Sequence, residues 1–149
     1  MRPVTTDERE VVRWFAARAN ELQRERVLSD LDQAQAEETR DEHLTIRFQV
    51  EGYTRPPYRG ERPLPVNACA LDFDGAKLDV SVSLDENDRL FQLQVLRFEA
   101  GPVQGPDWTT LRELSPGEVV KLGSIKISSL QLVFWRIRRL MGRLTGRCT

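Results

Sequence analysis

The stretch that decides the fold is residues 71–99, LDFDGAKLDVSVSLDENDRLFQLQVLRFE. Within it, residues 78–84 alternate Leu and Val with Asp and Ser, which is the period-two pattern of a strand with one buried and one solvated face. Asp74-Gly75 lies between two extended runs and predicts a two-residue hairpin turn, because glycine adopts a positive φ without strain. A second, looser turn is expected at residues 85–88. We therefore predict a β-meander at the centre of the fold.

Another strand is expected before this meander. Residues 44–50 alternate Leu44, Ile46, Phe48 and Val50 with polar residues, which again predicts a half-buried strand. The strands of the meander itself are expected at residues 66–73, 77–84 and 89–98. The last of these carries apolar residues on both faces, which is typical of a central strand. Together they predict a four-stranded, mainly antiparallel sheet.

The N-terminal part predicts helices that cover this sheet. Thr5 followed by Glu8 fits a capping box at the start of a helix that runs to about residue 24. Its apolar stripe consists of Val11, Trp14, Phe15, Ala19 and Leu22. A second stripe follows without a breaking Gly or Pro, formed by Val27, Leu28, Leu31 and Ala34. The sequence leaves open whether the two helices are continuous, and we expect the helical region to end at residues 40–43. The predicted fold class is α+β, with N-terminal helices packed on the sheet and a C-terminal amphipathic element added.

Two segments are expected outside the regular sheet. Residues 53–65, YTRPPYRGERPLP, contain four prolines and predict a long exposed loop, because proline removes backbone donors. Its Arg55 and Arg59 alternate with tyrosines, a composition suited to gripping an acidic partner or stacking on bases. Residues 101–117 are expected to place Trp108, Leu111 and Leu114 on a helical turn after Asp107.

Charge is distributed unevenly along the chain. The whole sequence holds 22 basic and 23 acidic residues and has a formal net charge of −1. No acidic residue follows Glu118 whereas seven basic residues do, so residues 1–118 carry −8 and the remainder carries +7. An acidic body and a basic tail attract different partners. We divide the chain into a single α+β domain, residues 1–122, and a basic amphipathic C-terminal tail, residues 123–149.

The tail supports more than one interpretation. From Ser128 it predicts an amphipathic helix with arginines opposite an apolar face formed by Leu130, Val133, Phe134, Ile137, Leu140, Met141 and Leu144. A strand at residues 124–134 is the local alternative, since Ile and Val favour extension. The tail is expected to dock on the body, to contact a membrane surface or a partner helix, or to be poorly ordered, and the sequence leaves these open.

Composition indicates a soluble globular protein, with 40% hydrophobic and 30% charged residues. No apolar run approaches the roughly 20 residues needed to span a bilayer. The first residues, MRPVTTDERE, are acidic where a secretory signal requires an apolar stretch. Cys69 and Cys148 offer neither a disulfide framework nor the spacing of metal ligands. We expect a cytoplasmic protein without a cofactor.

Few residues are candidates for catalysis. Asp72-x-Asp74-Gly75 is similar to the start of a calcium loop, but the twelfth residue counted from Asp72 is Ser83 and not a bidentate Glu. His43, the single histidine, has no Ser or Cys partner at a recognisable spacing. The carboxylates are expected in turns or on a solvated face, where burial does not raise a pKa as acid–base catalysis requires. We predict that the protein is not an enzyme.

Three short motifs point to a family. They are the helical step Leu28–Gln33, the hairpin Asp72–Gly75 and the strand Leu90–Gln94. Together they resemble a family of small uncharacterised bacterial domains, a domain of unknown function, over about residues 6–98. The tail after Leu122 lies outside the resemblance. The resemblance implies a small cytoplasmic protein, and some members of the family are similar to immunity proteins that neutralise toxins.

On these grounds we predict a non-catalytic protein-binding module, an immunity-type protein that neutralises a cognate basic toxin through its acidic surface. The expected partner contacts are Asp72, Asp74, Asp85, Glu86, Asp88, Arg55 and Arg59. One alternative is a peripheral adaptor attached to an anionic membrane or to nucleic acid by the tail, although we do not favour nucleic acid. A small hydrolase is a third. The sequence leaves the oligomeric state open.

Overall fold

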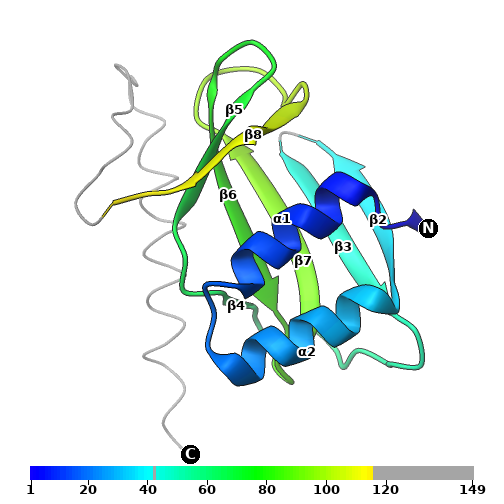
Figure 1. Cartoon of the computed structure of the whole chain (residues 1–149). Helices are drawn as coiled ribbons and strands as arrows, with labels where there is room; N and C mark the ends of the chain where they lie inside the picture. Colours follow the sequence, from blue (N-terminus) through cyan, green and yellow to red (C-terminus); the bar gives the residue numbers. More distant parts are fainter. Residues whose placement is uncertain (42, 116–149) are drawn as a thin grey trace, which may run out of the picture. The chain divides into compact units, whose positions relative to one another are not determined.

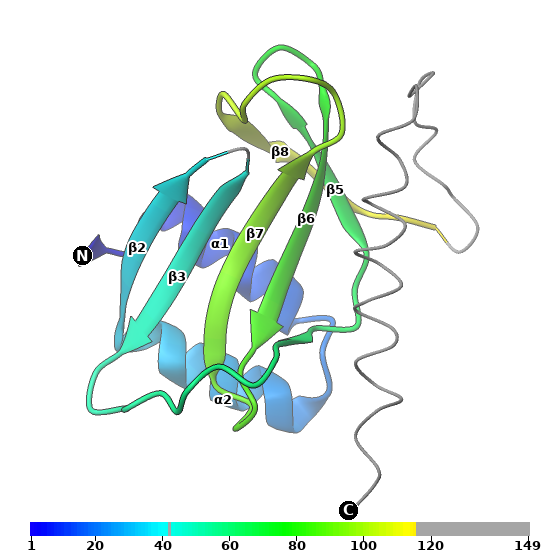
Figure 2. The same ribbon diagram turned by 180° about the vertical axis from the view of Figure 1, so that it is seen from behind.

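The computed structural model describes residues 1–41 and 43–115, which form two helices and an antiparallel sheet. The predicted C-terminal tail and the predicted domain boundary at residue 122 lie outside the described residues. In Figure 1 both helices lie across one face of the sheet, and Figure 2 shows the opposite face, on which no helix of the described part lies. The α+β class is therefore confirmed. None of the helices within the described ranges is long and apolar enough to cross a membrane.

The sheet has eight strands in the described residues, where the sequence predicted four. The strands are β1 (Arg2–Pro3), β2 (Ala34–Arg40), β3 (Leu44–Val50), β4 (Arg62–Pro63), β5 (Ala68–Asp72), β6 (Lys77–Leu84), β7 (Leu90–Arg97) and β8 (Pro106–Glu113). Their order across the sheet is β1-β2-β3-β7-β6-β5-β8, with β4 paired to β6, and all of these pairs are antiparallel. The predicted meander is present as β5, β6 and β7, and β7 is central as predicted.

The two helices are separate. Helix α1 (Thr6–Ala16) begins at the predicted capping box, in which Thr5 and Glu8 each bond the other's backbone N–H. Helix α2 (Glu21–Asp32) has its own N-cap, because the Asn20 side chain accepts a hydrogen bond from the Gln23 N–H. Helix α1 therefore ends at Ala16, well before the predicted residue 24, and a new helix begins after Asn20.

The predicted helical region after residue 33 is wrong, because Ala34–Arg40 form strand β2. This strand pairs with β3 along its whole length, from Ala34 opposite Val50 to Arg40 opposite Leu44. Only Ala34 and Ala36 are buried in it, and the rest is exposed and polar. Pairing with a distant strand, and not local propensity, sets its conformation.

The core lies between the helices and one face of the sheet. Leu78, Val80 and Val82 are each at most 1% exposed, which confirms the register predicted for β6. The helices contribute Val12, Phe15, Val27 and Leu31 to the same cluster. Leu90, Leu93 and Val95 of β7 belong to the same cluster, although a regular alternation would place Leu90 on the other face from Leu93 and Val95. An irregularity in the β6–β7 pairing at Ser83/Leu84 shifts the alternation.

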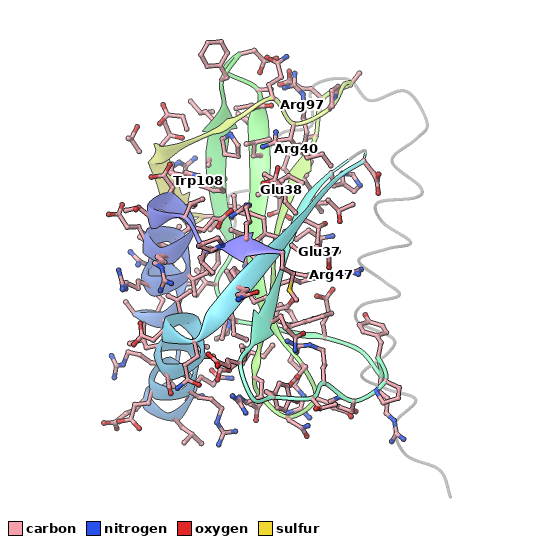
Figure 3. The ribbon with its side chains drawn as sticks, turned by 90° about the vertical axis from the view of Figure 1, so that its right-hand side faces the viewer. Glu37, Glu38, Arg40, Arg47, Arg97 and Trp108 are labelled. Atoms are coloured by element: carbon pink, nitrogen blue, oxygen red, sulfur yellow. The ribbon has the colours of Figure 1, made fainter. Side chains whose placement is uncertain are left out.

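Two further segments differ from their predictions. The helical turn predicted after Asp107 is wrong, since β8 occupies residues 106–113 and pairs with β5. Its Trp108 lies on the helix side of the sheet and packs against the core (Figure 3). The proline-rich segment 53–65 is not entirely loop, because Arg62 and Pro63 pair with the end of β6.

Candidate partner-binding surface

The first charged cluster surrounds Asp85 at the start of the β6–β7 turn. Asp85 is only 5% exposed, although the sequence predicted a solvated turn residue. Its carboxylate accepts hydrogen bonds from the Tyr53 hydroxyl (2.8 Å), Arg55 Nη1 (2.6 Å) and the backbone N–H groups of Asn87 (2.9 Å) and Arg89 (3.0 Å). Arg55 Nη2 also donates to the carbonyl oxygens of Phe48 (2.9 Å) and Leu90 (3.0 Å). The loop and the turn are therefore fastened to each other and to the strand ends.

The same cluster reaches helix α2 through Arg89. Asp30 of α2 is 3% exposed and receives Arg89 Nε (2.9 Å), Arg89 Nη2 (2.6 Å) and the Leu90 N–H (2.9 Å). The hydrogen bond that Arg89 donates to Asp30 raises the pKa of Arg89 above its ordinary value. The Arg89 guanidinium also lies 4.4 Å from the centre of the Tyr53 ring. This contact ties α2 to the start of the central strand.

Three of the predicted contact residues lie on the surface around this cluster. Asp88 is partly exposed and pairs with Arg62 at 3.1 Å. Glu86 is partly exposed and Arg59 is exposed. Beside them a shallow pocket of about 550 Å³ with mixed polar and apolar walls lies between α2 and the turn, and Leu22, Arg26 and Asn87 contribute to its walls.

The second charged cluster surrounds Asp72 at the β5–β6 hairpin. Asp72 is 2% exposed, and its carboxylate accepts from the backbone N–H groups of Phe73 (2.9 Å), Gln104 (2.9 Å) and Gly105 (2.7 Å) and from Arg97 Nη1 (2.6 Å). Burial alone would raise the pKa of Asp72, but these hydrogen bonds outweigh it and hold the pKa below its ordinary value of 3.8. The carboxylate thereby links the hairpin to the loop between β7 and β8.

Arg97 also binds the hairpin loop directly. Its Nη2 lies 2.6 Å from one oxygen of Asp74 and its Nη1 lies 3.0 Å from the other. The side chain of Arg97 is 7% exposed, and Figure 3 places it near the end of the sheet from which the hairpin projects. The hydrogen bond from Arg97 is the main reason that the pKa of Asp74 lies below its ordinary value. Arg97 therefore bridges two carboxylates of one turn.

The hairpin loop has three residues, Phe73–Gly75, and not the two predicted. Gly75 N–H donates to the Asp72 carbonyl (2.8 Å), and Asp72 N–H donates to the Ala76 carbonyl (2.7 Å). Gly75 has φ = +83°, which fits the glycine that closes a three-residue hairpin loop. The ring of Phe73, at the first position of this loop, is 85% exposed.

A third charged cluster lies at the edge of the sheet. Arg2 of β1 binds Glu8 of α1 at 2.5 Å and Glu38 of β2 at 2.9 Å. Arg40 pairs with the same Glu38, and Figure 3 shows both side chains on β2. These contacts fasten the short edge strand to the helix layer.

The structure does not bring the seven predicted contacts together. Asp72 and Asp74 lie at one end of β6, and the other five lie at or near its opposite end. Since β6 has eight residues, the two groups are roughly 25 Å apart. Asp72, Asp85 and Arg55 are also held inside the fold by their ion pairs, so their side chains are not available as surface contacts. Phe73, Arg97, Asp30 and Arg89 were missed, and only the aromatic residue inside an Asp-x-Asp-Gly turn was a local signal.

One comparison identifies the family. A family model described as a domain of unknown function, DUF6984, matches residues 1–106, which is more than half of the chain. The chain belongs to this family. The match begins at β1 and ends at the start of β8, so it includes all three charged clusters. No curated protein and no solved structure matches the chain.

The charged clusters stabilise the fold, because their ion pairs connect loops, strands and helices. Within residues 1–41 and 43–115, no group of three or more His, Cys, Asp or Glu side chains is placed to bind a metal ion. The buried carboxylates Asp30, Asp72 and Asp85 each face an arginine. Asp72, whose pKa is lowered by its hydrogen bonds, is a poor general acid, because its proton is bound less tightly than in solution.

Proposed function

We propose that the domain is a non-catalytic protein-binding module with an acidic binding surface. The observation that supports it is the placement of the charged side chains: buried carboxylates form ion pairs with arginines, whereas several exposed carboxylates do not. The buried carboxylates are neutralised by arginines inside the fold, so the net charge of the described residues, −6 from 15 basic and 21 acidic side chains, is carried by the surface. On the two helices, the exposed acidic side chains that form no ion pair with another described residue are Asp7, Glu10, Glu21 and Glu25.

An immunity-type protein is the most specific form of this proposal. A toxin that acts on nucleic acid or on another anionic substrate needs a basic active site, and an acidic inhibitor associates rapidly with such a surface. These carboxylates of the helices replace the turn residues as expected contacts, because they are exposed and form no ion pair with another described residue. A cytoplasmic location is part of this proposal.

A second candidate rests on the sequence of the tail. The +7 charge after Glu118 favours a peripheral adaptor attached to an anionic membrane. Sedimentation of the full-length protein with anionic vesicles, compared with vesicles of neutral lipid, tests it. Binding to anionic vesicles alone supports the adaptor, and no binding to either contradicts it.

The main proposal is tested by the salt dependence of association with a partner identified by cross-linking in cells that produce the protein. The association rate constant should fall at least about tenfold between roughly 0.01 M and 0.15 M salt, while the dissociation rate constant changes less. Neutralising two acids with Glu21→Gln and Glu25→Gln should slow association. Arg13→Gln, which removes an exposed base on the neighbouring helix, is the matched control and should speed it.

Association that responds to neither salt nor these substitutions would contradict the acidic surface. A partner that the domain turns over as a substrate would contradict the non-catalytic proposal as a whole. For a toxin partner, one equivalent of the domain should abolish the toxin's activity.

A further inference from the structure

We propose that Phe73 is the anchor through which the domain binds its partner, and that its ring enters an apolar pocket on a protein surface bordered by basic side chains. This inference rests on the proposed protein-binding function. It assigns a contact that the acidic surface does not by itself require.

Exposure of the ring is the first observation. Phe73 is 85% exposed, more than Tyr58 at 70% or Leu22 at 67%. Tyr58 has a neighbour, since its ring centre lies 6.1 Å from that of Phe91, and Leu22 lies on the wall of the pocket beside α2. Among the described residues, Phe73 has no aromatic or cationic group against its ring. Single exposed apolar side chains are common, so exposure alone does not identify an anchor.

The second, independent observation is that hydrogen bonds and ion pairs fix the conformation of the hairpin loop. Every backbone N–H from Asp72 to Ala76 has a hydrogen-bond acceptor within the hairpin, except that of Asp74. The Asp72 carboxylate additionally fixes the hairpin to Gln104 and Gly105, and Arg97 grips both carboxylates of the turn. An Asp-Gly hairpin forms without these contacts to Arg97, Gln104 and Gly105, so they are not needed to make the turn.

This bracing has a consequence for binding. Fixing a loop during association lowers affinity, because its conformational entropy is lost at that moment. A loop fixed in the free protein avoids this loss, and hot spots of interfaces are accordingly rich in aromatic residues held in well-packed settings. Phe73 is an aromatic residue on such a fixed loop, since its side chain is exposed to solvent while hydrogen bonds fix the backbone that carries it.

The charges around the tip indicate the partner's chemistry. Glu99 and Asp107 are exposed carboxylates on the segments beside the hairpin, and Lys77 is an exposed base there, while the charge of Asp74 is offset by Arg97. Leu71, 39% exposed, lies opposite Asp107 in the β5–β8 pairing and extends the apolar contact. An apolar centre with an acidic rim fits a pocket whose rim carries Lys or Arg.

The inference is tested by replacing Phe73 with the photo-reactive analogue benzoylphenylalanine in the full-length chain, in cells that produce the protein. Tyr58 and Leu22, two other highly exposed apolar side chains of the described part, receive the same analogue as matched controls. We expect a light-dependent adduct at position 73 with one protein, and weak or no adducts at the control positions. That protein is then purified, and its affinity for the variants is measured by calorimetry.

Phe73→Ser should raise the Kd at least about tenfold, and Tyr58→Ser should leave it within about twofold. The Phe73 side chain is exposed, so thermal melting should be unchanged in Phe73→Ser. An adduct at position 58 or 22 but not at 73, or an unchanged Kd for Phe73→Ser, overturns the anchor and leaves the protein-binding function standing. Absence of adducts at all three positions overturns both. An adduct with a second copy of this chain overturns the assigned partner chemistry.

Discussion

At the scale of single residues, the buried carboxylates decide how the loops are held. Asp72 and Asp85 occupy turns, yet each is at most 5% exposed and accepts four hydrogen bonds. Burying a carboxylate is unfavourable unless its oxygens are fully hydrogen-bonded and a counter-charge is near. Both conditions are met, so these residues stabilise the loops.

The ion pair of Asp74 with Arg97 predicts a specific pH dependence. The pKa of Asp74 is lower in the folded protein than its ordinary value of 3.8, so the pair stabilises the fold fully above that value, and the stabilisation is lost as the pH falls through the lowered pKa. The free energy of unfolding should therefore fall on acidification below about pH 4. Asp74→Asn should unfold more easily at pH 7 and should lose less stability on acidification than the wild type.

Urea denaturation over a series of pH values measures this difference. Asp41→Asn, which changes an exposed carboxylate that forms no ion pair with another described residue, is the matched control and should follow the wild-type curve. If Asp74→Asn and Asp41→Asn gave the same pH profile, the ion pair would have no role in stability.

The sequence predicted the buried face of β6 but not the buried carboxylates. Alternation of Leu and Val with polar residues is a local pattern, and it places Leu78, Val80 and Val82 correctly. The partners of Asp72 are 25 to 33 residues away in the chain, at Arg97, Gln104 and Gly105. No local pattern contains such contacts, so an Asp in a turn was assigned to solvent.

At the scale of elements, the contact of Asp30 with Arg89 and Leu90 fixes helix α2 to the central strand. Val27 and Leu31 supply apolar packing on the same side of the helix, and both are fully buried. Asp30 lies between them in sequence and provides a direction-specific contact to the central strand, because its two oxygens accept hydrogen bonds from the Arg89 guanidinium. The apolar residues hold the helix on the sheet, and Asp30 sets its position along it.

Removing this contact should be strongly destabilising. Asp30→Ala leaves the Arg89 guanidinium and the Leu90 N–H without their acceptor, and we expect a loss of about 3 kcal/mol in the free energy of unfolding. Asp32→Ala, two residues further along the same helix, removes only an exposed pair at 3.9 Å and should change stability by less than about 0.5 kcal/mol. Chemical denaturation measures both, and similar losses would contradict a specific role for Asp30.

Strands with a clear apolar pattern were predicted well, and polar strands were not. β3 and β6 have the predicted bounds, because their alternation is complete. β2 and β8 were predicted as helical, since β2 buries only two alanines and β8 alternates imperfectly. Their strand conformation comes from pairing with β3 and β5, which is a tertiary interaction.

At the scale of the whole described domain, the residues that stabilise the fold and the residues proposed to bind a partner lie in different places. Both helices cover one face of the sheet (Figures 1 and 2), and the charged clusters fasten its two ends and its edge. The arginines that pair with buried carboxylates leave acids of the helix layer exposed and without an ion pair among the described residues. At the hairpin tip, the Asp72 cluster holds Phe73, which is 85% exposed, out into solvent.

Rigidity of the free hairpin is the claim on which this division depends, and backbone ¹⁵N relaxation of the protein without a partner tests it directly. If the Asp72 and Arg97 contacts hold the tip in place, the order parameters of residues 73–77 and 103–105 should be close to about 0.85, as in the strands. Arg97→Gln should lower them while leaving β3 unchanged. Values below about 0.6 at the tip of the wild-type protein would contradict a preformed anchor.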